Sequence, residues 1–158
     1  MPKPTARSLV ATIAPRPIRL RADAVQESRL TLRVYYEDTD AAGVVYYANY
    51  WRFCERGRTE WLRERGFDQQ ILMDETGLAF VVRTVQGHYL RPARLDDTLT
   101  VVTAVDATRR ASLEFSQYVD RGTERLFTAT VSIACLDTRR GRPAPIPAHI
   151  RQSIEASA

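Results

Sequence analysis

Hydrophobic and polar positions along the chain change their period twice. Residues 29–37 alternate between apolar and polar side chains, which predicts a β-strand. From Tyr46 the apolar positions recur about every 3.6 residues, as on one face of an α-helix. The pattern stops at Gly66, so we expect a largely buried helix of about 20 residues. Gly57 lies in its middle, where a glycine suggests that the helix backbone closely approaches a sheet.

The second half of the chain predicts mainly strands. After a short helical segment or loop at 68–76, four stretches are rich in β-branched and aromatic residues. These stretches span residues 78–92, 97–108, 111–120 and 125–137. The connections between them have the length of hairpins, so we expect an antiparallel meander to which the first strand is added. The pattern therefore predicts an α+β fold in which one long helix covers a sheet of about five strands.

The expected domain boundaries follow from this pattern. Residues 28–148 form one domain, preceded by a flexible basic extension at 1–27 and followed by a C-terminal tail at 149–158. Residues 1–25 contribute all of the net charge of +4, and the acidic and basic residues of the remainder cancel. We therefore expect no nucleic-acid partner, because non-specific binding needs a basic surface on the folded domain.

The cysteines and histidines indicate a reduced protein without a metal site. Cys54 and Cys135 lie far apart in the sequence, and neither is close to a histidine. His88 and His149 are also widely separated, so no local zinc motif exists. No apolar run approaches the roughly 20 residues of a membrane span. We expect buried thiols, no metal and a cytoplasmic location.

The stretch "YEDTDAAGVVYYANY" at residues 36–50 is the richest in candidate chemistry. Asp38, Asp40 and Gly43 match part of a calcium-binding loop, but Ala42 and Asn49 stand where that loop needs further oxygen ligands. The calcium interpretation is therefore excluded. One alternative is a polar turn in which Asp38 or Asp40 orders the start of the helix.

A second alternative is catalytic. An acid at a strand end, a glycine turn and then a helix N-terminus would place a carboxylate beside free backbone N–H groups. Such amides can hold a developing oxyanion, and a carboxylate that faces them suits acyl transfer to water.

Two segments resemble a known family. "YYEDTDAAGVVYYANYWRFCERGRTEWL" (35–62) and "AFVVRTVQGHYLRPARLDDTLTV" (79–101) resemble the 4-hydroxybenzoyl-CoA thioesterase family of hotdog-fold proteins. The likeness is greatest to its Tol-Pal system-associated acyl-CoA thioesterases and extends over residues 29–148. It implies an antiparallel sheet wrapped around one helix, hydrolysis of acyl-CoA, and a cytoplasmic homodimer or homotetramer with sites across the subunit interface. Coenzyme A would be part of the substrate, and no cofactor is expected.

The resemblance assigns roles to residues of the motif. It makes Asp40 the catalytic carboxylate, which either activates water or attacks the thioester to form an anhydride, and it makes the N–H of Tyr47 the oxyanion donor. Many members of the subgroup carry histidine where this chain has Tyr47. If the strand continued through the motif, Asp38 and Asp40 would share a side, and we hypothesise that they interact.

Further residues are candidates for binding the substrate. Arg109 and Arg110, in a predicted hairpin, match the place where family members carry basic residues that meet coenzyme A phosphates; the alternative is two solvated arginines. Asn49 orders either the helix start or the bound thioester. Four aromatic residues line either an acyl pocket or the core: Tyr46, Tyr50, Trp51 and Trp61.

Other functions stay open at this point. A non-catalytic module that binds acyl-CoA or acyl carrier protein near the cell envelope would keep the pocket and the arginines without needing Asp40. Acyl carrier protein is also an alternative donor to coenzyme A for the enzyme, and a location peripheral to the inner membrane would suit the Tol-Pal likeness.

Overall fold

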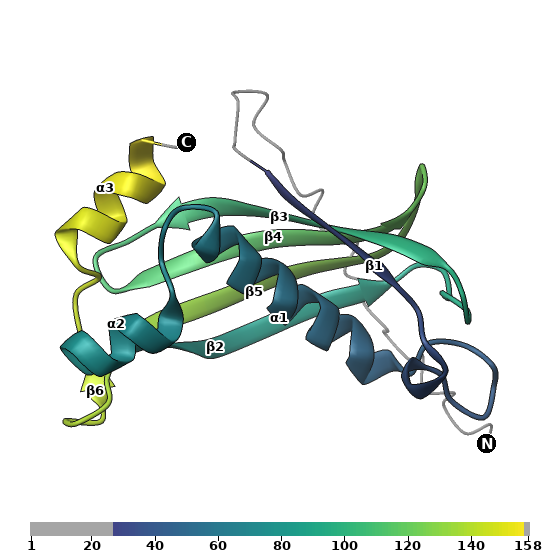
Figure 1. The fold of residues 1–158 in the computed structure, drawn as a ribbon, viewed down its shortest axis with the longest axis horizontal. Helices are drawn as coiled ribbons and strands as arrows, with labels where there is room; N and C mark the ends of the chain where they lie inside the picture. The colour runs from purple at the N-terminus through teal and green to yellow at the C-terminus, as the bar shows by residue number, and fades with distance from the viewer. Residues whose placement is uncertain (1–26, 157–158) are drawn as a thin grey trace, which may run out of the picture.

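The fold, seen in a computed structural model that describes residues 27–156, is one sheet curved around one long helix (Figure 1). Apart from Glu27, the predicted N-terminal extension lies outside the described residues. The long helix is α1 (Tyr47–Arg63), and two shorter helices are α2 (Gln69–Thr76) and α3 (Ala148–Ala156). The strands are β1 (Ser28–Arg33), β2 (Leu78–Tyr89), β3 (Thr98–Thr108), β4 (Ser112–Arg121), β5 (Glu124–Asp137) and β6 (Arg142–Pro143).

The sheet order corrects one expectation. The strands lie in the order β1-β3-β4-β5-β2, with β6 beside β5, and all the pairs are antiparallel. β2 therefore pairs with β5 and not with β3, so the predicted four-stranded meander was wrong at its first connection. Residues 90–97 carry the chain across three strand spacings, about 14 Å, which is within reach of an extended segment of that length.

Backbone hydrogen bonds hold this crossing connection in place. Arg91 N donates to Leu126 O of β5, and Asp96 N donates to Val34 O beyond β1. Between them, Val45 N donates to Ala93 O. The backbone groups of the connection are therefore satisfied although no hairpin forms. Its length is compatible with a hairpin or with this crossing, so the length alone was misleading.

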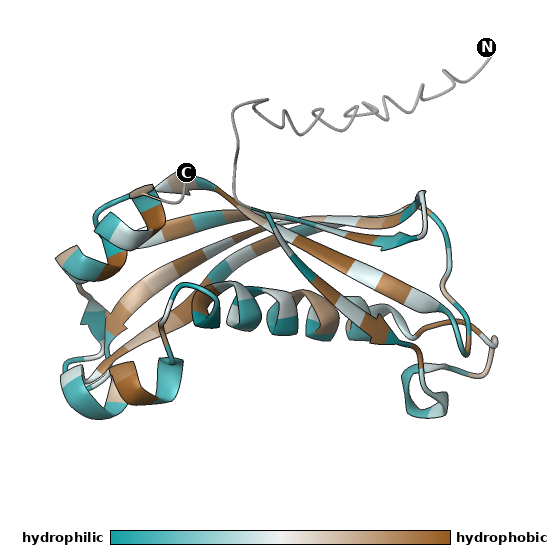
Figure 2. Ribbon diagram, turned by 45° about the horizontal axis from the view of Figure 1, so that its top comes forward, coloured by the Kyte–Doolittle hydropathy of each residue, from teal (hydrophilic) through white to brown (hydrophobic). Residues whose placement is uncertain are grey.

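Helix α1 lies on the concave face of the sheet, against β1, β3 and β4 (Figures 1 and 2). The strands above it in Figure 2 show alternating hydrophobic and hydrophilic bands, as expected when one face is buried. A Cβ atom on Gly57 would stand 2.7 Å from Thr103 Oγ1 and 2.9 Å from Val101 Cγ1. The predicted close approach at Gly57 is confirmed, and the architecture is the one that the resemblance implies.

Two segments differ from the sequence prediction. β1 ends at Arg33, and residues Tyr36–Asp38 form a 3-10 helix (η1) in which Asp38 Oδ2 accepts a hydrogen bond from Tyr35 N at 2.9 Å. Asp38 and Asp40 are consequently not alternate residues of one strand, as the hypothesis of their interaction required. At the other end, residues 148–156, where a C-terminal tail was expected from residue 149, form helix α3, whose Ile150 and Ile154 are buried.

Cys54 and Cys135 are buried free thiols, as predicted. Within residues 27–156, no helix combines the length and the apolar character that crossing a membrane requires.

Candidate active site

Asp40 lies in a tight hairpin loop directly before α1. Thr39 and Val45 form an isolated antiparallel bridge, Asp40 N donates to Val44 O, and Gly43 N donates back to Asp40 O. Gly43 has a φ of 73°, in the left-handed region that glycine adopts at little cost, which explains the glycine at the end of this turn. The loop returns the chain sharply and leaves the Asp40 side chain exposed.

The two oxygens of the Asp40 carboxylate differ in their surroundings. Oδ1 accepts a hydrogen bond from Ala42 N at 2.8 Å, as in an Asx turn. Oδ2 accepts no hydrogen bond from any residue in the described part of the chain. The loop therefore orients the carboxylate through one oxygen and keeps the other available.

The start of α1 is tied to the same loop through one carbonyl group. Asp38 O accepts hydrogen bonds from Tyr46 N and from Asn49 Nδ2, both at 2.9 Å. Asn49 is 5% exposed, so its side chain orders the helix start, the first of the two roles considered for it. These bonds fix the turn that carries Asp40 relative to the first residues of the helix.

The first turn of α1 offers unused donors. Among residues 27–156, no acceptor partners the backbone N–H of Tyr47 or of Ala48. The first turn also contains no acidic residue, so the partial positive charge of the helix N-terminus is not neutralised locally. An anion or a polarised carbonyl oxygen would be stabilised here.

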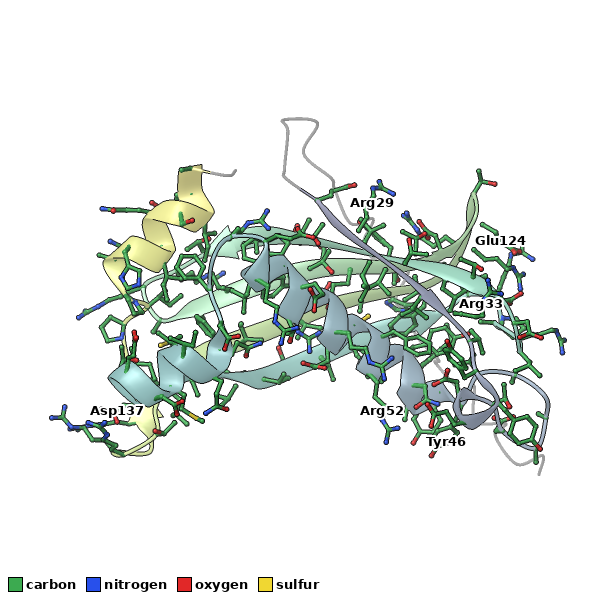
Figure 3. The ribbon with its side chains drawn as sticks, viewed as in Figure 1. Arg29, Arg33, Tyr46, Arg52, Glu124 and Asp137 are labelled. Atoms are coloured by element: carbon green, nitrogen blue, oxygen red, sulfur yellow. The ribbon has the colours of Figure 1, made fainter. Side chains whose placement is uncertain are left out.

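Three exposed tyrosines, Tyr46, Tyr47 and Tyr89, form a tyrosine patch beside these amides. The ring centroids are 4.8 Å apart for Tyr46 and Tyr47, and 6.4 Å apart for Tyr47 and Tyr89. A hydrogen bond with the Tyr47 side chain raises the pKa of Tyr46, and the negative charge of Asp40 adds to this effect. Figure 3 shows Tyr46 where α1 begins, at the end of the molecule that also carries η1.

The other aromatic candidates divide between core and surface. Tyr50 and Trp61 are 3% and 2% exposed and belong to the core. Trp51 is partly exposed on the flank of α1 that faces β2, where its Nε1 donates to the hydroxyl of Tyr89 at 3.0 Å. Tyr89 was not among the residues expected at the site. The available signal was strand alternation, which places Tyr89 on the same face of β2 as Gly87 and on the opposite face from His88.

Arg109 and Arg110 are exposed in the turn between β3 and β4. Strand β3 has 11 residues and extends for about 36 Å, and the loop that carries Asp40 adjoins its other end. In Figure 3, Tyr46 and Asp137, the last residue of β5, lie toward opposite ends of the molecule. A single copy of the chain therefore does not bring the two arginines and Asp40 together.

In comparisons with known proteins, the chain is similar to thioesterases. A family described as the thioesterase-like superfamily matches residues 34–154. The chain is 48% identical over 123 residues to the acyl-CoA thioesterase YbgC of Haemophilus influenzae, covering 78% of this chain and 90% of that protein. A crystal structure of a probable thioesterase from Bartonella henselae matches with a TM-score of 0.72 and 39% identity, over 77% of this chain and 99% of that one.

A third comparison bears on the fold alone. A mutant 4-hydroxybenzoyl CoA thioesterase, solved in complex with 4-hydroxybenzoyl CoA, matches with a TM-score of 0.76 over 81% of this chain and 98% of that one. The identity is 22%, so the shared feature is the sheet curved around a helix.

Proposed function

Because the chain belongs to the thioesterase-like superfamily and is a thioester hydrolase, we propose that it hydrolyses acyl-CoA to a free acid and coenzyme A with the carboxylate of Asp40. The observation that supports this most strongly is the position of Asp40. It stands in a fixed turn immediately before a helix whose first amides have no acceptor within the described residues and whose first turn holds no acid.

The reaction follows from this arrangement. The thioester carbonyl oxygen accepts a hydrogen bond from the N–H of Tyr47, which stabilises the negative charge that develops on that oxygen. Asp40 either takes a proton from an attacking water or attacks the carbonyl carbon itself to give an anhydride, which water then opens. In both routes the carbon–sulfur bond breaks, and the thiolate of coenzyme A leaves.

A single carboxylate is sufficient because of this leaving group. A thiol has a pKa of about 8.5, so its thiolate departs without the strong acid that an alkoxide or an amine requires. The tyrosine patch, with the phenol of Tyr47 in place of the histidine common in the Tol-Pal subgroup, provides an aromatic surface for the acyl group. The acyl group, which reacts next to the Tyr47 amide, would pack against these rings.

We further propose that the enzyme works as a homo-oligomer, a dimer or a tetramer. β2 lies at one edge of the sheet, and its Val82 and Val85 are each 52% exposed on the concave side, which favours a second copy as the partner. A second copy would also allow its own Arg109 and Arg110 to meet the coenzyme A phosphates of a substrate bound at Asp40.

We expect the protein in the cytoplasm, at the inner membrane if it serves the Tol-Pal system, with acyl carrier protein as the alternative donor.

The test is release of thiol from short, long and aromatic acyl-CoAs by the native protein, by Asp40→Asn and by Glu37→Gln. Glu37 is an exposed acid in the same segment and serves as the matched control. We expect Asp40→Asn to lower kcat by about 100-fold or more, and Glu37→Gln to leave it near the native value. If the native protein binds these substrates but releases no thiol, it is a binding module, whereas native turnover by Asp40→Asn would show that another group does the chemistry.

A further inference from the structure

The hydroxyl of Tyr89 connects the last residue of strand β2 to the first residue of helix α1, and we propose that Tyr89 is a positioning residue for the oxyanion-binding amides. The inference rests on the proposed function and assigns a role to a hydroxyl group that this function does not by itself require. The Tyr89 hydroxyl would act through the backbone of Tyr47 and Ala48 and not on the substrate.

The connection is a chain of two hydrogen bonds. Trp51 Nε1 donates to the Tyr89 hydroxyl oxygen at 3.0 Å, and the Tyr89 hydroxyl donates to Tyr47 O at 3.1 Å. Because the indole N–H can only donate, it occupies the oxygen of Tyr89 and directs the hydroxyl proton to Tyr47 O. Burial raises the pKa of Tyr89 and the hydrogen bond from Trp51 lowers it; burial prevails, so the hydroxyl keeps its proton at neutral pH.

These hydrogen bonds join α1 to a strand outside its main contacts. α1 lies mainly against β1, β3 and β4, and the Trp51 and Tyr89 side chains link its first turns to β2. Trp51 fits over Gly87 of β2: a Cβ at Gly87 would stand 2.8 Å from the Cζ2 and Cη2 atoms of the indole. The indole also meets Phe127 edge to face, with centroids 5.1 Å apart. Trp51 is therefore held in a position from which it can orient Tyr89.

The carbonyl that receives the hydroxyl proton belongs to the peptide unit whose N–H is that of Ala48. In the helix this carbonyl also faces the N–H one turn further on, so it has two donors. Donors on a carbonyl polarise the whole peptide unit and strengthen its N–H as a donor. Tyr89 would thus fix the direction of the first turn of α1, which carries the N–H of Tyr47, and increase the attraction of the neighbouring Ala48 N–H for an oxyanion.

One substitution removes the Tyr89 hydroxyl and keeps the ring. The Tyr89 ring packs against Phe127 and Tyr50, with centroids 4.8 and 5.6 Å away, and these contacts are retained in Tyr89→Phe. Tyr118 on the outer face of the sheet supplies the control, Tyr118→Phe, because it lies on the opposite side of the sheet from α1.

The experiment measures kcat, KM and the melting temperature for the native protein, Tyr89→Phe, Tyr118→Phe, Trp51→Phe and the double variant Trp51→Phe/Tyr89→Phe. We expect Tyr89→Phe to lower kcat about 10-fold with KM changed by less than about twofold, because the amides act on the transition state. In the Trp51→Phe background the loss caused by Tyr89→Phe should be smaller, since both residues act through one chain of hydrogen bonds. Tyr118→Phe should match the native kcat.

The proposal would be overturned if Tyr89→Phe had the same kcat as the native protein. It would also be overturned if a lower kcat were fully explained by a loss of folded protein. Fully additive losses in the double variant would also count against it. Asp40→Asn is measured in the same series. Turnover that survives this substitution contradicts the proposed function, whereas an Asp40-dependent enzyme that is indifferent to Tyr89→Phe contradicts the present inference alone. If the native protein has no turnover, both proposals fall.

Discussion

At the scale of single residues, Gly57 shows how one missing side chain sets the distance between helix and sheet. It lies over a buried polar group in which Gln117 Nε2 donates to Cys54 O and to Thr103 Oγ1, both at 2.8 Å. We expect Gly57→Ala to destabilise the protein by about 1–3 kcal/mol, because overpacking outweighs the better helix propensity of alanine. Urea unfolding would measure the change, with Glu55→Ala on the exposed side of α1 as control; a more stable Gly57→Ala variant would contradict the packing described here.

Cys54 gives a second prediction at this scale. Burial raises the pKa of its thiol to about 12, so very little thiolate exists at neutral pH. We expect Cys54 to resist alkylation in the folded protein at pH 8 and to react at once after unfolding in urea. Mass spectrometry of iodoacetamide-treated protein would check this. Rapid labelling of Cys54 under native conditions would mean that α1 lifts from the sheet far more readily than its packing suggests.

At the scale of elements, the long periodic segments were predictable and the short ones were not. The helical period of α1 and the alternation of β2 to β5 are each carried by many side chains. The predicted ends of these elements therefore lie within a few residues of those in the structure. Residues 34–37 were part of the predicted strand, but the Asp38 side chain accepts a hydrogen bond from the N–H of Tyr35 and the chain turns. A local hydrogen bond of this kind leaves no trace in the hydrophobic pattern.

The candidate site was likewise predictable only in part, where its residues are close together in the sequence. Asp40 before a helix N-terminus could be found from the sequence, because strand, glycine turn and helix are all local. The hydrogen bond between Tyr89 and Tyr47 joins residues 42 positions apart, and it depends on β2 lying at the edge of the sheet beside β5. The connection 90–97 had the length of a hairpin, so the sequence offered no sign of that strand order.

Helix α3 supplies a prediction at the same scale. Ile146, Ile150 and Ile154 recur every four residues and are all buried, and Pro147 precedes the helix at a position that proline tolerates. We expect Ile150→Ala to lower the free energy of unfolding by about 2–4 kcal/mol, as in a core, whereas the exposed Gln152→Ala should change it by less than about 0.5 kcal/mol. Chemical denaturation of both variants checks this, and equal stabilities would mean that α3 does not pack as part of the domain.

At the scale of the whole molecule, an ion-pair network fastens the crossing connection to the β4–β5 hairpin. Asp97 Oδ2 accepts from Arg121 Nη1 at 2.7 Å and from Arg94 N at 2.8 Å, and Arg121 also meets Glu124. Burial by itself would raise the pKa of Asp97, but these hydrogen bonds outweigh it and hold the pKa below its usual value. The connection is thus fixed by charge as well as by its backbone.

The pH dependence follows from that direction. A carboxyl group whose pKa is lower in the folded state stabilises the fold above its unfolded pKa of about 3.9, and this contribution disappears as the pH falls through the folded value. We therefore expect the stability difference between native protein and Asp97→Asn to be largest near pH 6 and to shrink below about pH 4. Denaturation curves from pH 3 to pH 7 would measure it, and a difference that stays constant with pH would exclude the ionised form of Asp97 as its source.

The position of β2 at the sheet edge also governs how the chain acquires its structure during synthesis. β2 finds its partner only when β5 has been made, and Val85 pairs with Val131. β3, β4 and β5 follow one another and close through short turns, so this hairpin series can form first. Until β5 leaves the ribosome, the sheet that α1 covers is incomplete and β2 has no strand to pair with. The emerging polypeptide therefore carries an unpaired apolar strand from the synthesis of β2 until that of β5, and chaperones that bind such strands should engage it during this interval.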